Sequence, residues 1–483
     1  MDLRWGRTFE SFSEDPRIAG ELSAAEVRGI QRCGFPMAAC VKHWVADGGT
    51  SSGTGKFDMG GIGKSVQAHG LDQGDALLDE AELRRTHIAP YLAPLAAGAL
   101  SVMASYSSVN SVKCHSSGWL INELLKKELG FEGVVVSDYN AVQQVDASFD
   151  AALAKVLNAG VDIIMTAGGI FGDLCFRKQL AAMELAVETG AVPMERIDDA
   201  VRRVLRVKIK MGLMQAAEGE GRGARRLFCT PEPPLAEGEG RGARRLFCTP
   251  EPPLGDPSCV GSAEHRAVAR RAVAKSCVLL KDAAGLLPLA GGELLVTGAA
   301  AHDLGYQCGG WTLEWQGFRG NGRTAGTTLW EAIRAVRPDA TLVGSRAAHA
   351  RKPALTSPVA LVLTGEPPYA EGFGDVASLA LPTADAEAAI ALAEAGWSVV
   401  LVLVSGRPLV LPPRLLGKLT AVVAAWLPGT EGGGLADVLF GKLGFSGKLS
   451  FSWPRDDGQA RATLRARDPL FPLGHGLDTQ PHV

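Results

Sequence analysis

Short apolar runs of strand length alternate with stretches of helical length along most of the chain. In the first half the apolar runs are Met37–Val41, Leu100–Ser105, Gly133–Ser137 and Val161–Met165, and helical stretches cover about Trp119–Lys127 and Asp150–Asn158. Runs of β-branched and aliphatic residues bounded by Gly are typical of strands that are buried on both faces. Strands that alternate with helices predict βαβ units and a parallel sheet.

The second half of the chain shows the same alternation. After a helix at about Ser262–Cys277 and the apolar segment Val278–Lys281, the predicted strands are Glu293–Thr297, a short one near Thr341, Val359–Thr364, Ser398–Val404 and Leu419–Trp426. Predicted helices at about Thr328–Val336 and Ala384–Ala395 lie between them. Five strands with interleaved helices predict an open, doubly wound α/β sheet.

A perfect tandem repeat separates the two halves. Residues Ala217–Leu235 recur without a change as Ala236–Leu254, and both copies are rich in Gly, Pro and Arg. Solenoid repeats diverge and come in threes or more, so we interpret this pair as a recent duplication, or an error of gene assembly, within a surface linker. The predicted organisation is an α/β domain in residues 1–214, a linker in 215–260 and a second α/β domain in 261–478.

Polar side chains follow three of the predicted strands where each strand ends. Asp138 and Tyr139 come directly after one run, Lys42 and His43 after another, and Tyr106 after the third. One such residue is often only a helix cap or an Asx turn. Because the carboxyl ends of parallel strands meet at one rim, three in succession predict a single site there.

Composition excludes several classes of function. The formal net charge of −3 argues against nucleic acid as a partner. No apolar run reaches the roughly 18 residues that a membrane span needs. The nine cysteines show no Cys-x-x-Cys spacing, so neither a zinc site nor a disulfide framework is indicated, and no metal or organic cofactor is expected.

Several longer motifs occur in a recognisable order. They are Trp5–Arg7 with Glu10–Pro16, Lys42–Thr50, Met103–Asn110, Val136–Tyr139, Gly305–Thr312, Glu314–Gly317, Trp426–Gly432 and Phe471–Leu477. In identity, order and spacing they resemble those of glycoside hydrolase family 3, in particular its β-glucosidases and exo-β-glucanases. The resemblance implies a TIM-like (β/α) barrel domain followed by a doubly wound α/β sandwich domain.

The resemblance also implies a reaction and a set of site residues. Members of the family hydrolyse terminal non-reducing β-D-glucosyl residues of β-glucosides and β-glucans with retention, using two carboxylates about 5–5.5 Å apart. The family's nucleophile falls on Asp138, and its acid/base, in the Leu-Pro-Gly-x-Glu-Gly motif, falls on Glu431. Glu431 could instead only stabilise a helix N-terminus.

The remaining site residues implied by the resemblance bind the sugar. They are Arg7, Lys42 and His43 on the hydroxyls, Met103 and Tyr106 in the pocket lining, Tyr139 where the family often has Trp, and Trp311 with Trp315 as an aromatic clamp around the next sugar. The expected partner is a β-glucoside or β-glucan oligosaccharide. The resemblance requires no metal.

One departure from the family keeps three hypotheses open. The family's barrel has eight strands, whereas about four are predicted before the linker, so we expect an incomplete barrel from a fragment of a longer product or a degraded copy. The hypotheses are an exo-acting β-glucosidase, a non-catalytic carbohydrate-binding remnant, and the family's N-acetylglucosaminidase branch. The catalytic His loop of that branch has no counterpart in Ser51–Lys56. Linkage preference and compartment stay open, although family members are often secreted.

Overall fold

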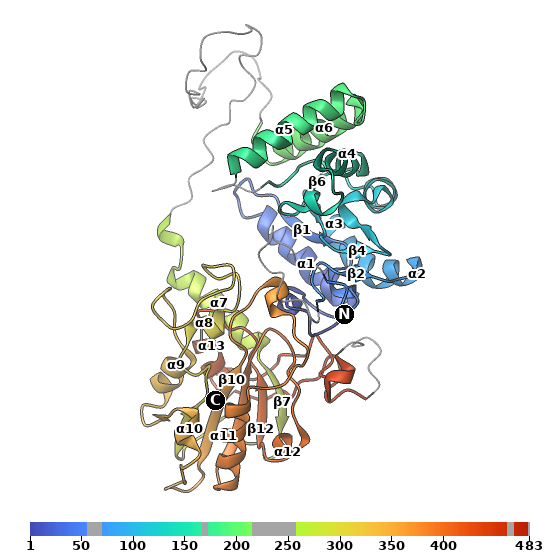
Figure 1. Cartoon of the computed structure of the whole chain (residues 1–483). Helices are drawn as coiled ribbons and strands as arrows, with labels where there is room; N and C mark the ends of the chain where they lie inside the picture. The colour runs from blue at the N-terminus through green and yellow to red at the C-terminus, as the bar shows by residue number, and fades with distance from the viewer. Residues whose placement is uncertain (56–69, 167–171, 215–256, 461–467, 482–483) are drawn as a thin grey trace, which may run out of the picture. The chain divides into compact units, whose positions relative to one another are not determined.

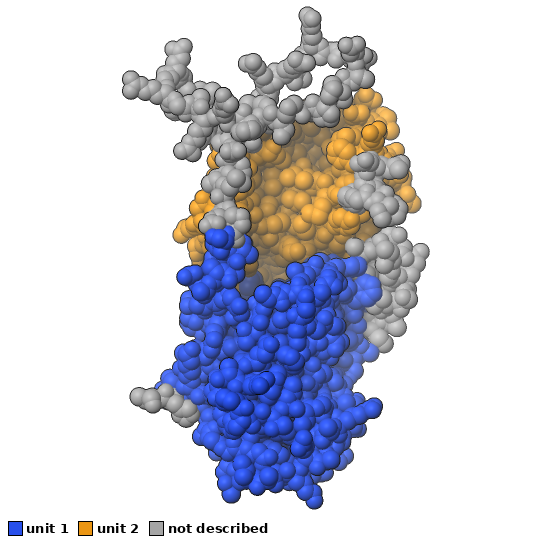
Figure 2. Space-filling model, turned by 90° about the vertical axis from the view of Figure 1, so that its left-hand side faces the viewer, with its two compact units in different colours: residues 1–18, 50–72, 257–483 blue, residues 19–49, 73–256 orange. Residues whose placement is uncertain are grey.

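A computed structural model describes residues 1–55, 70–166, 172–214, 257–460 and 468–481 (Figure 1). The tandem repeat lies outside the described residues. The chain forms two compact units, coloured separately in Figure 2. Unit 1 comprises Met1–Ile18, Thr50–Asp72 and Pro257–Val483, and unit 2 comprises Ala19–Gly49 and Gln73–Asp256.

These units divide the chain differently from the predicted domain boundaries. The prediction placed residues 1–214 in one domain, whereas the first 18 residues pack with the C-terminal half. The N–H of Leu3 donates to the carbonyl of Ala460 at 3.1 Å, and the N–H of Glu14 donates to the carbonyl of Ser450 at 3.1 Å. The Trp5–Arg7 motif therefore belongs to unit 1.

The core of unit 1 is a six-stranded sheet. Its strands are β7 (Val278–Asp282), β8 (Leu294–Thr297), β9 (Thr341–Leu342), β10 (Val359–Gly365), β11 (Ser398–Val404) and β12 (Ala421–Ala424). Their order is β7-β12-β11-β10-β8-β9, and all neighbours are parallel except β12 and β7. The predicted doubly wound fold is confirmed, and β7 adds an antiparallel edge strand. The strand order reverses at β8, because β9 lies on one side of it and β10 on the other.

Helices cover both faces of this sheet (Figure 1). One face packs against α7 (Ala263–Ser276), α8 (Leu304–Cys308), α9 (Leu329–Val336) and α13 (Gly433–Leu439), and the other against α10 (Ser345–Ala348), α11 (Thr383–Glu394) and α12 (Pro413–Leu416). Every residue of β10 is buried, which explains why this strand is a continuous apolar run rather than an alternating one. Short 3₁₀ segments are η1 (Thr8–Glu10), η7 (Pro257–Cys259), η8 (Glu371–Gly374) and η9 (Asp457–Gln459).

Unit 2 is built on the parallel sheet β1-β3-β6, formed by Cys40–Trp44, Ser101–Ala104 and Val134–Val136. A small second sheet contains β2 (Asp75–Ala76), β4 (Ser108–Val109) and β5 (Val112–Lys113). The helices are α1 (Pro16–Gln31, which starts in unit 1), α2 (Glu80–Glu82), η3 (Leu83–Ile88), α3 (Ala89–Ala96), η5 (Trp119–Glu128), α4 (Phe149–Ala159), α5 (Gly172–Glu188) and α6 (Met194–Lys210). Short 3₁₀ turns are η2 (Asp47–Gly49), η4 (Cys114–Ser116) and η6 (Ala141–Gln144). Within the described ranges, every helix is too short or too polar to cross a bilayer.

Two strands of unit 2 differ from the prediction. Strand β1 starts at Cys40 and ends at Trp44, so that Lys42 and His43 lie within the strand rather than beyond it. Trp44, the last residue of the strand, is fully buried in the core. The strand therefore continues through the polar residues Lys42 and His43 before it ends. The predicted strand Val161–Met165 is reduced to a single bridge between Ile163 and Val136.

Candidate active site

Strand β6 places Asp138 at the carboxyl edge of the sheet of unit 2. The residue is 8% exposed, and its backbone N–H donates to Nε2 of His115 at 2.9 Å. The N–H of Tyr139 donates to Oδ1 of Asp138 at 2.6 Å. Among the described residues, the buried Oδ2 of Asp138 accepts no hydrogen bond. One oxygen is thus fixed by the backbone while the other remains available for chemistry.

The imidazole of His43 lies beside that available oxygen. Its Nε2 is 3.5 Å from Oδ2 of Asp138, and its Nδ1 is 2.9 Å from Oδ2 of Asp47. The other oxygen of Asp47 accepts hydrogen bonds from the hydroxyls of Ser105 and Ser107. A carboxylate behind an imidazole fixes the orientation of the ring. Asp47, His43 and Asp138 therefore form one oriented row of groups.

The buried His115 supports the backbone of Asp138. Burial, together with the charge of Lys113, lowers the pKa of His115 to about 3. The imidazole is accordingly neutral, and its Nε2 can accept the hydrogen bond from the Asp138 N–H. His115 was not noted in the sequence, and Asp47 was included only as part of the Lys42–Thr50 motif, without a role in the site.

The other predicted residues of unit 2 lie at the same edge of the sheet. The hydroxyl of Tyr106 donates to the carbonyl of Tyr139, whose own side chain is 38% exposed. Met103 on β3 is paired with Val136, two residues before Asp138. The charges of Lys42 and Asp138 both act on the Cys40 thiol, so both lie near it. Unit 2 thus places its six predicted site residues on or just after the adjacent strands β1, β3 and β6.

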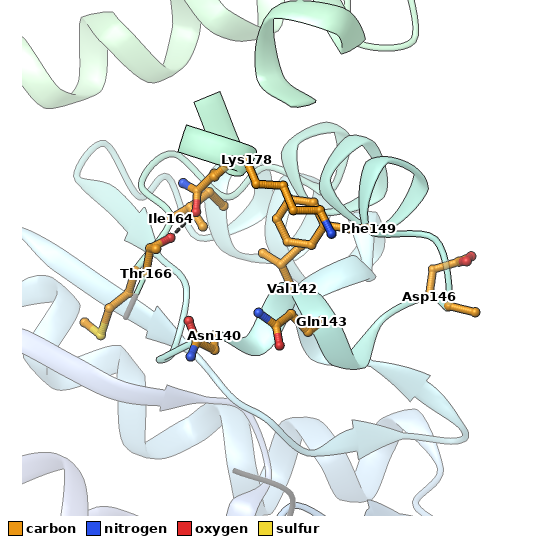
Figure 3. Close-up of a pocket in the computed structure, with 11 residues that line it drawn as sticks. Asn140, Val142, Gln143, Asp146, Phe149, Ile164, Thr166 and Lys178 are labelled. Atoms are coloured by element: carbon orange, nitrogen blue, oxygen red, sulfur yellow. Dashed lines mark hydrogen bonds between the residues drawn. The ribbon is translucent and has the colours of Figure 1, made fainter. Parts of the chain in front are cut away.

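A cavity of about 300 Å³ lies in unit 2, lined by side chains from the segments that follow β6 (Figure 3). It is lined by Asn140, Val142, Gln143, Asp146, Ala147, Phe149, Ile164, Met165, Thr166, Lys178 and Gln179. The ammonium of Lys178 lies 5.0 Å from the centre of the Phe149 ring, and the hydroxyl of Thr166 donates to Gln179 (Figure 3). No predicted site residue lines this cavity.

Unit 1 contains a second cluster, centred on the buried guanidinium of Arg7. Its Nε and Nη2 each donate to the carboxylate of Glu10 at 2.8 Å, and its Nη1 donates to Oε1 of Glu371 at 3.2 Å. Each carboxylate also accepts from an indole. Trp311 donates to Glu10 at 3.0 Å and Trp315 donates to Glu371 at 2.8 Å. Arg7 therefore links two carboxylate–tryptophan pairs.

The topology of the sheet explains why these loops meet. Trp311 and Trp315 follow α8, in the connection that leaves β8, and Glu371 follows β10. Strand order reverses at β8, and in open α/β sheets ligands bind outside the carboxyl ends of the strands at such a point. The cluster lies where this fold class places its binding sites.

The N-terminal segment is fastened to the Glu371 loop by close backbone contacts. A Cβ on Gly6 would lie 2.0 Å from the carbonyl oxygen of Glu371, so glycine alone allows this approach. The N–H of Gly6 donates to Asp375 at 2.8 Å. The fully buried Arg407 donates to the carbonyls of Arg4 and Gly374 at 2.9 and 2.8 Å. These contacts hold Arg7 next to Glu371.

A third carboxyl of unit 1, that of Asp72, lies within electrostatic range of the same cluster. It is 5% exposed and accepts a hydrogen bond from the Trp5 indole at 3.0 Å. Burial raises the pKa of Asp72 to about 8; the charges of Asp375 and Glu371 add to this effect, and that of Arg7 opposes it. Asp72 is therefore mostly protonated at neutral pH.

Glu431, predicted as the acid/base, lies among different contacts. It precedes Gly432, the N-cap residue of α13, is 6% exposed, and accepts a hydrogen bond from Nε of Arg266 at 2.7 Å. Of the predicted sugar-binding residues of unit 1, Arg7 and Trp315 contact Glu371 instead, and Trp311 joins them through Glu10. Glu371 was not among the predicted residues; it lies in η8, within the loop that follows the buried strand β10, whereas Asp138 comes almost directly after β6.

Among the described residues, no group of three or more His, Cys, Asp or Glu side chains is arranged to hold a metal ion. The chemistry available in both clusters is that of carboxyl groups, imidazoles, a guanidinium and aromatic rings. Carboxylate pairs and hydrogen-bond donors of this kind suit the binding and cleavage of glycosides.

Comparison with known families agrees with this chemistry. Residues 1–207 match the glycosyl hydrolase family 3 N-terminal domain, and residues 277–479 match the glycosyl hydrolase family 3 C-terminal domain. A lysosomal β-glucosidase of Dictyostelium discoideum is 29% identical over 98% of this chain and 56% of its own length. A periplasmic β-glucosidase of Salmonella typhimurium is 28% identical over 99% of this chain and 63% of its own length. The chain thus spans 56–63% of the length of these relatives.

Solved structures show the same similarity. A mutant of an exo-1,3/1,4-β-glucanase from a Pseudoalteromonas species is 35% identical, with a TM-score of 0.79, and the match covers 99% of this chain and 72% of that one. A β-glucosidase from Listeria innocua in complex with glucose is 26% identical, with a TM-score of 0.77, covering 99% of this chain and 63% of that one.

Proposed function

Because the chain belongs to glycosyl hydrolase family 3, we propose that it acts in the hydrolysis of terminal non-reducing β-D-glucosyl residues from β-glucosides and β-glucans. The observation that carries this proposal is the carboxylate of Asp138, whose Oδ2 lies 3.5 Å from His43 and accepts no hydrogen bond in the described part of the chain. A nucleophile in a retaining mechanism needs such an oriented and available oxygen.

We assign the nucleophile to Asp138 and the sugar-binding contacts to side chains at both clusters. Those side chains are Arg7, Lys42, His43, Met103, Tyr106, Tyr139, Trp311 and Trp315. Guanidinium, ammonium and imidazole groups donate to sugar hydroxyls, and aromatic rings stack on the apolar faces of sugars. The 47% exposure of Trp311 leaves its ring accessible for such stacking.

For the general acid we propose Glu371 in preference to Glu431. Glu371 is 6% exposed and has a left-handed backbone conformation (φ 55°), which a non-glycine residue adopts only when its surroundings enforce it. It contacts both Arg7 and Trp315. Glu431 instead pairs with Arg266 at the start of α13, where a carboxylate stabilises the helix N-terminus.

The test uses the full chain with 4-nitrophenyl β-D-glucopyranoside and a β-linked glucose disaccharide. We expect both to be hydrolysed, with β-glucose as the first anomer seen by proton NMR, because double displacement retains configuration. Release of α-glucose first would contradict retention. If calorimetry shows that the wild-type chain binds the disaccharide as tightly as Asp138→Asn does, and the wild-type chain does not hydrolyse it, the result favours the carbohydrate-binding remnant.

A further inference from the structure

Glu10 is the one member of the Arg7 cluster to which no role has yet been assigned. It accepts both parallel hydrogen bonds of the Arg7 guanidinium at 2.8 Å and the indole N–H of Trp311 at 3.0 Å. Its side chain is 22% exposed, so water screens these bonds only in part. Two-pronged bonds between guanidinium and carboxylate fix orientation as well as distance.

Trp311 depends on external contacts for its position. Its backbone is left-handed (φ 65°) and its side chain is 47% exposed. Its indole N–H donates to Glu10, and the guanidinium of Arg7 lies 5.8 Å from the ring centre. Trp315 differs, because Phe373 packs edge-on against its ring at 5.5 Å.

We propose that Glu10 is a positioning residue that holds the Trp311 ring and the Arg7 guanidinium as one rigid unit, and thereby favours substrates with a second sugar over aryl glucosides. This inference rests on the proposed function for its effect on specificity. Its structural part, the anchoring of Trp311, stands without that function. Restricting the ring before binding lowers the ordering cost of stacking on a sugar.

Glu10 acts on the substrate through other residues. A disaccharide would contact the indole face of Trp311, whereas a small aryl aglycone gains less from a fixed ring. Loss of Glu10 therefore raises KM for the disaccharide more than for the aryl glucoside. Because Arg7 keeps its bond to Glu371, kcat changes less than KM.

The first experiment reads the indole N–H of Trp311 directly, by NMR of the full chain. In Glu10→Ala we expect its hydrogen exchange to accelerate about tenfold or more, since an acceptor is lost. Glu10→Gln keeps an oxygen for the indole and should retain most of the protection. The buried Trp453, whose indole donates to the carbonyl of Leu409 at 2.8 Å, serves as the internal reference.

The matched control is Glu314→Ala, which removes another glutamate of the Trp311 loop that pairs with Arg323 instead. It should leave Trp311 exchange and both KM values unchanged. For Glu10→Ala we expect KM to rise about fivefold to tenfold for the disaccharide and less than about twofold for 4-nitrophenyl β-D-glucopyranoside. In Trp311→Phe, which lacks the indole N–H, the additional substitution Glu10→Ala should then raise KM for the disaccharide little further.

Failure of the two proposals can be told apart. Unchanged exchange of Trp311 in Glu10→Ala overturns the role of Glu10, whether or not the chain hydrolyses glucosides. Accelerated exchange with equal KM changes for both substrates overturns the specificity claim. If the wild-type chain hydrolyses neither substrate, the proposed function is wrong. The hydrogen exchange of the Trp311 indole in Glu10→Ala then still tests whether Glu10 anchors this ring.

Discussion

The two units hold their key carboxylates in different ways. In unit 2, Asp138 lies directly at the end of β6 and is fixed mainly by the backbone N–H of Tyr139. In unit 1, Glu371 is fixed by the side chains of Arg7 and Trp315, which come from segments 364 and 56 residues away in sequence. The first arrangement is local to one strand end. The second exists only after distant segments have packed together.

The difference predicts unequal tolerance to change. A carboxylate held by its own strand end keeps its place when a neighbouring side chain is altered. A carboxylate held by other side chains moves when any of them is removed, and side chains within one network act non-additively. Substitutions at the two carboxylates and their partners should therefore differ in effect.

The largest effect is expected at Asp138. If it attacks the anomeric carbon, Asp138→Asn should lower kcat/KM for 4-nitrophenyl β-D-glucopyranoside by about 10⁴-fold or more, because no other group supplies the covalent step. Azide added to Asp138→Ala should restore part of the turnover and yield the α-glucosyl azide.

The matched control for that change is Asp146→Asn, which alters another carboxylate of the same unit, paired with Lys155. Its activity should equal that of the wild type. If Asp138→Asn turns over substrate at the wild-type rate, Asp138 has no part in the mechanism. The inference of a catalytic carboxylate at the end of β6 is then wrong.

The next effect separates Glu371 from Glu431. Glu371→Gln should slow the hydrolysis of a disaccharide by about 10³-fold, and that of activated aryl glucosides far less, since good leaving groups need no proton. Glu431→Gln should reduce thermal stability through loss of the Arg266 ion pair and change kcat little for either substrate. If Glu431→Gln slows the disaccharide far more than the activated aryl glucosides, and Glu371→Gln does not, the general acid is Glu431.

The site residues of unit 2 could be predicted from the sequence more completely than those of unit 1, and the reason is physical. Asp138, His43 and Tyr106 lie on or beside consecutive parallel strands, so their meeting follows from the βαβ pattern alone. Arg7, Trp311 and Trp315 were found through resemblance, but Glu371, the partner that Arg7 and Trp315 share, was not. Its position depends on close packing of Gly6 against the loop after β10, and no local periodicity encodes such a contact.

The fold shows a similar limit. Strands of unit 1 that are buried on both faces, such as Ser398–Val404, were predicted with correct bounds. The bounds of β1 were wrong because the strand carries Lys42 and His43 at its end, and polar residues appeared to terminate it. A functional strand departs from the apolar pattern at the residues that carry its chemistry.

The two units should also respond oppositely to pH. His115 in unit 2 is neutral when folded, with a pKa of about 3 against 6.5 when unfolded. The unfolded chain then binds more protons as pH falls below 6.5, so unit 2 loses about 2 kcal/mol between pH 7 and pH 5 from this group. Asp72 in unit 1 has a pKa of about 8 against 3.8. The folded state then binds more protons, and unit 1 loses stability as pH rises from about 4 to 8.

Hydrogen exchange of each unit at pH 5, 6.5 and 8 measures this contrast. We expect amides of β6 to lose protection toward pH 5 and amides of β10 to lose protection toward pH 8, after correction for intrinsic rates. Asp72→Asn, which mimics the neutral carboxyl, should flatten the trend in β10 and leave β6 unaffected. As a control, replacing the exposed His265 with Gln should change neither trend. Parallel trends in both units would contradict these protonation states.

The smallest effect concerns the indole of Trp315, which tests how far Glu371 depends on its neighbours. Trp315→Phe keeps a ring to pack against Phe373 but removes the 2.8 Å bond to Glu371. A hydrogen bond to a carboxyl group contributes about 1 kcal/mol or slightly more, so kcat for the disaccharide should fall about fivefold to tenfold. Activated aryl glucosides should be nearly unaffected, because they need no protonation, and in Glu371→Gln the same change should add little. An equal loss for both leaving groups would mean that Trp315 serves only sugar binding, and that Glu371 is held as firmly as Asp138.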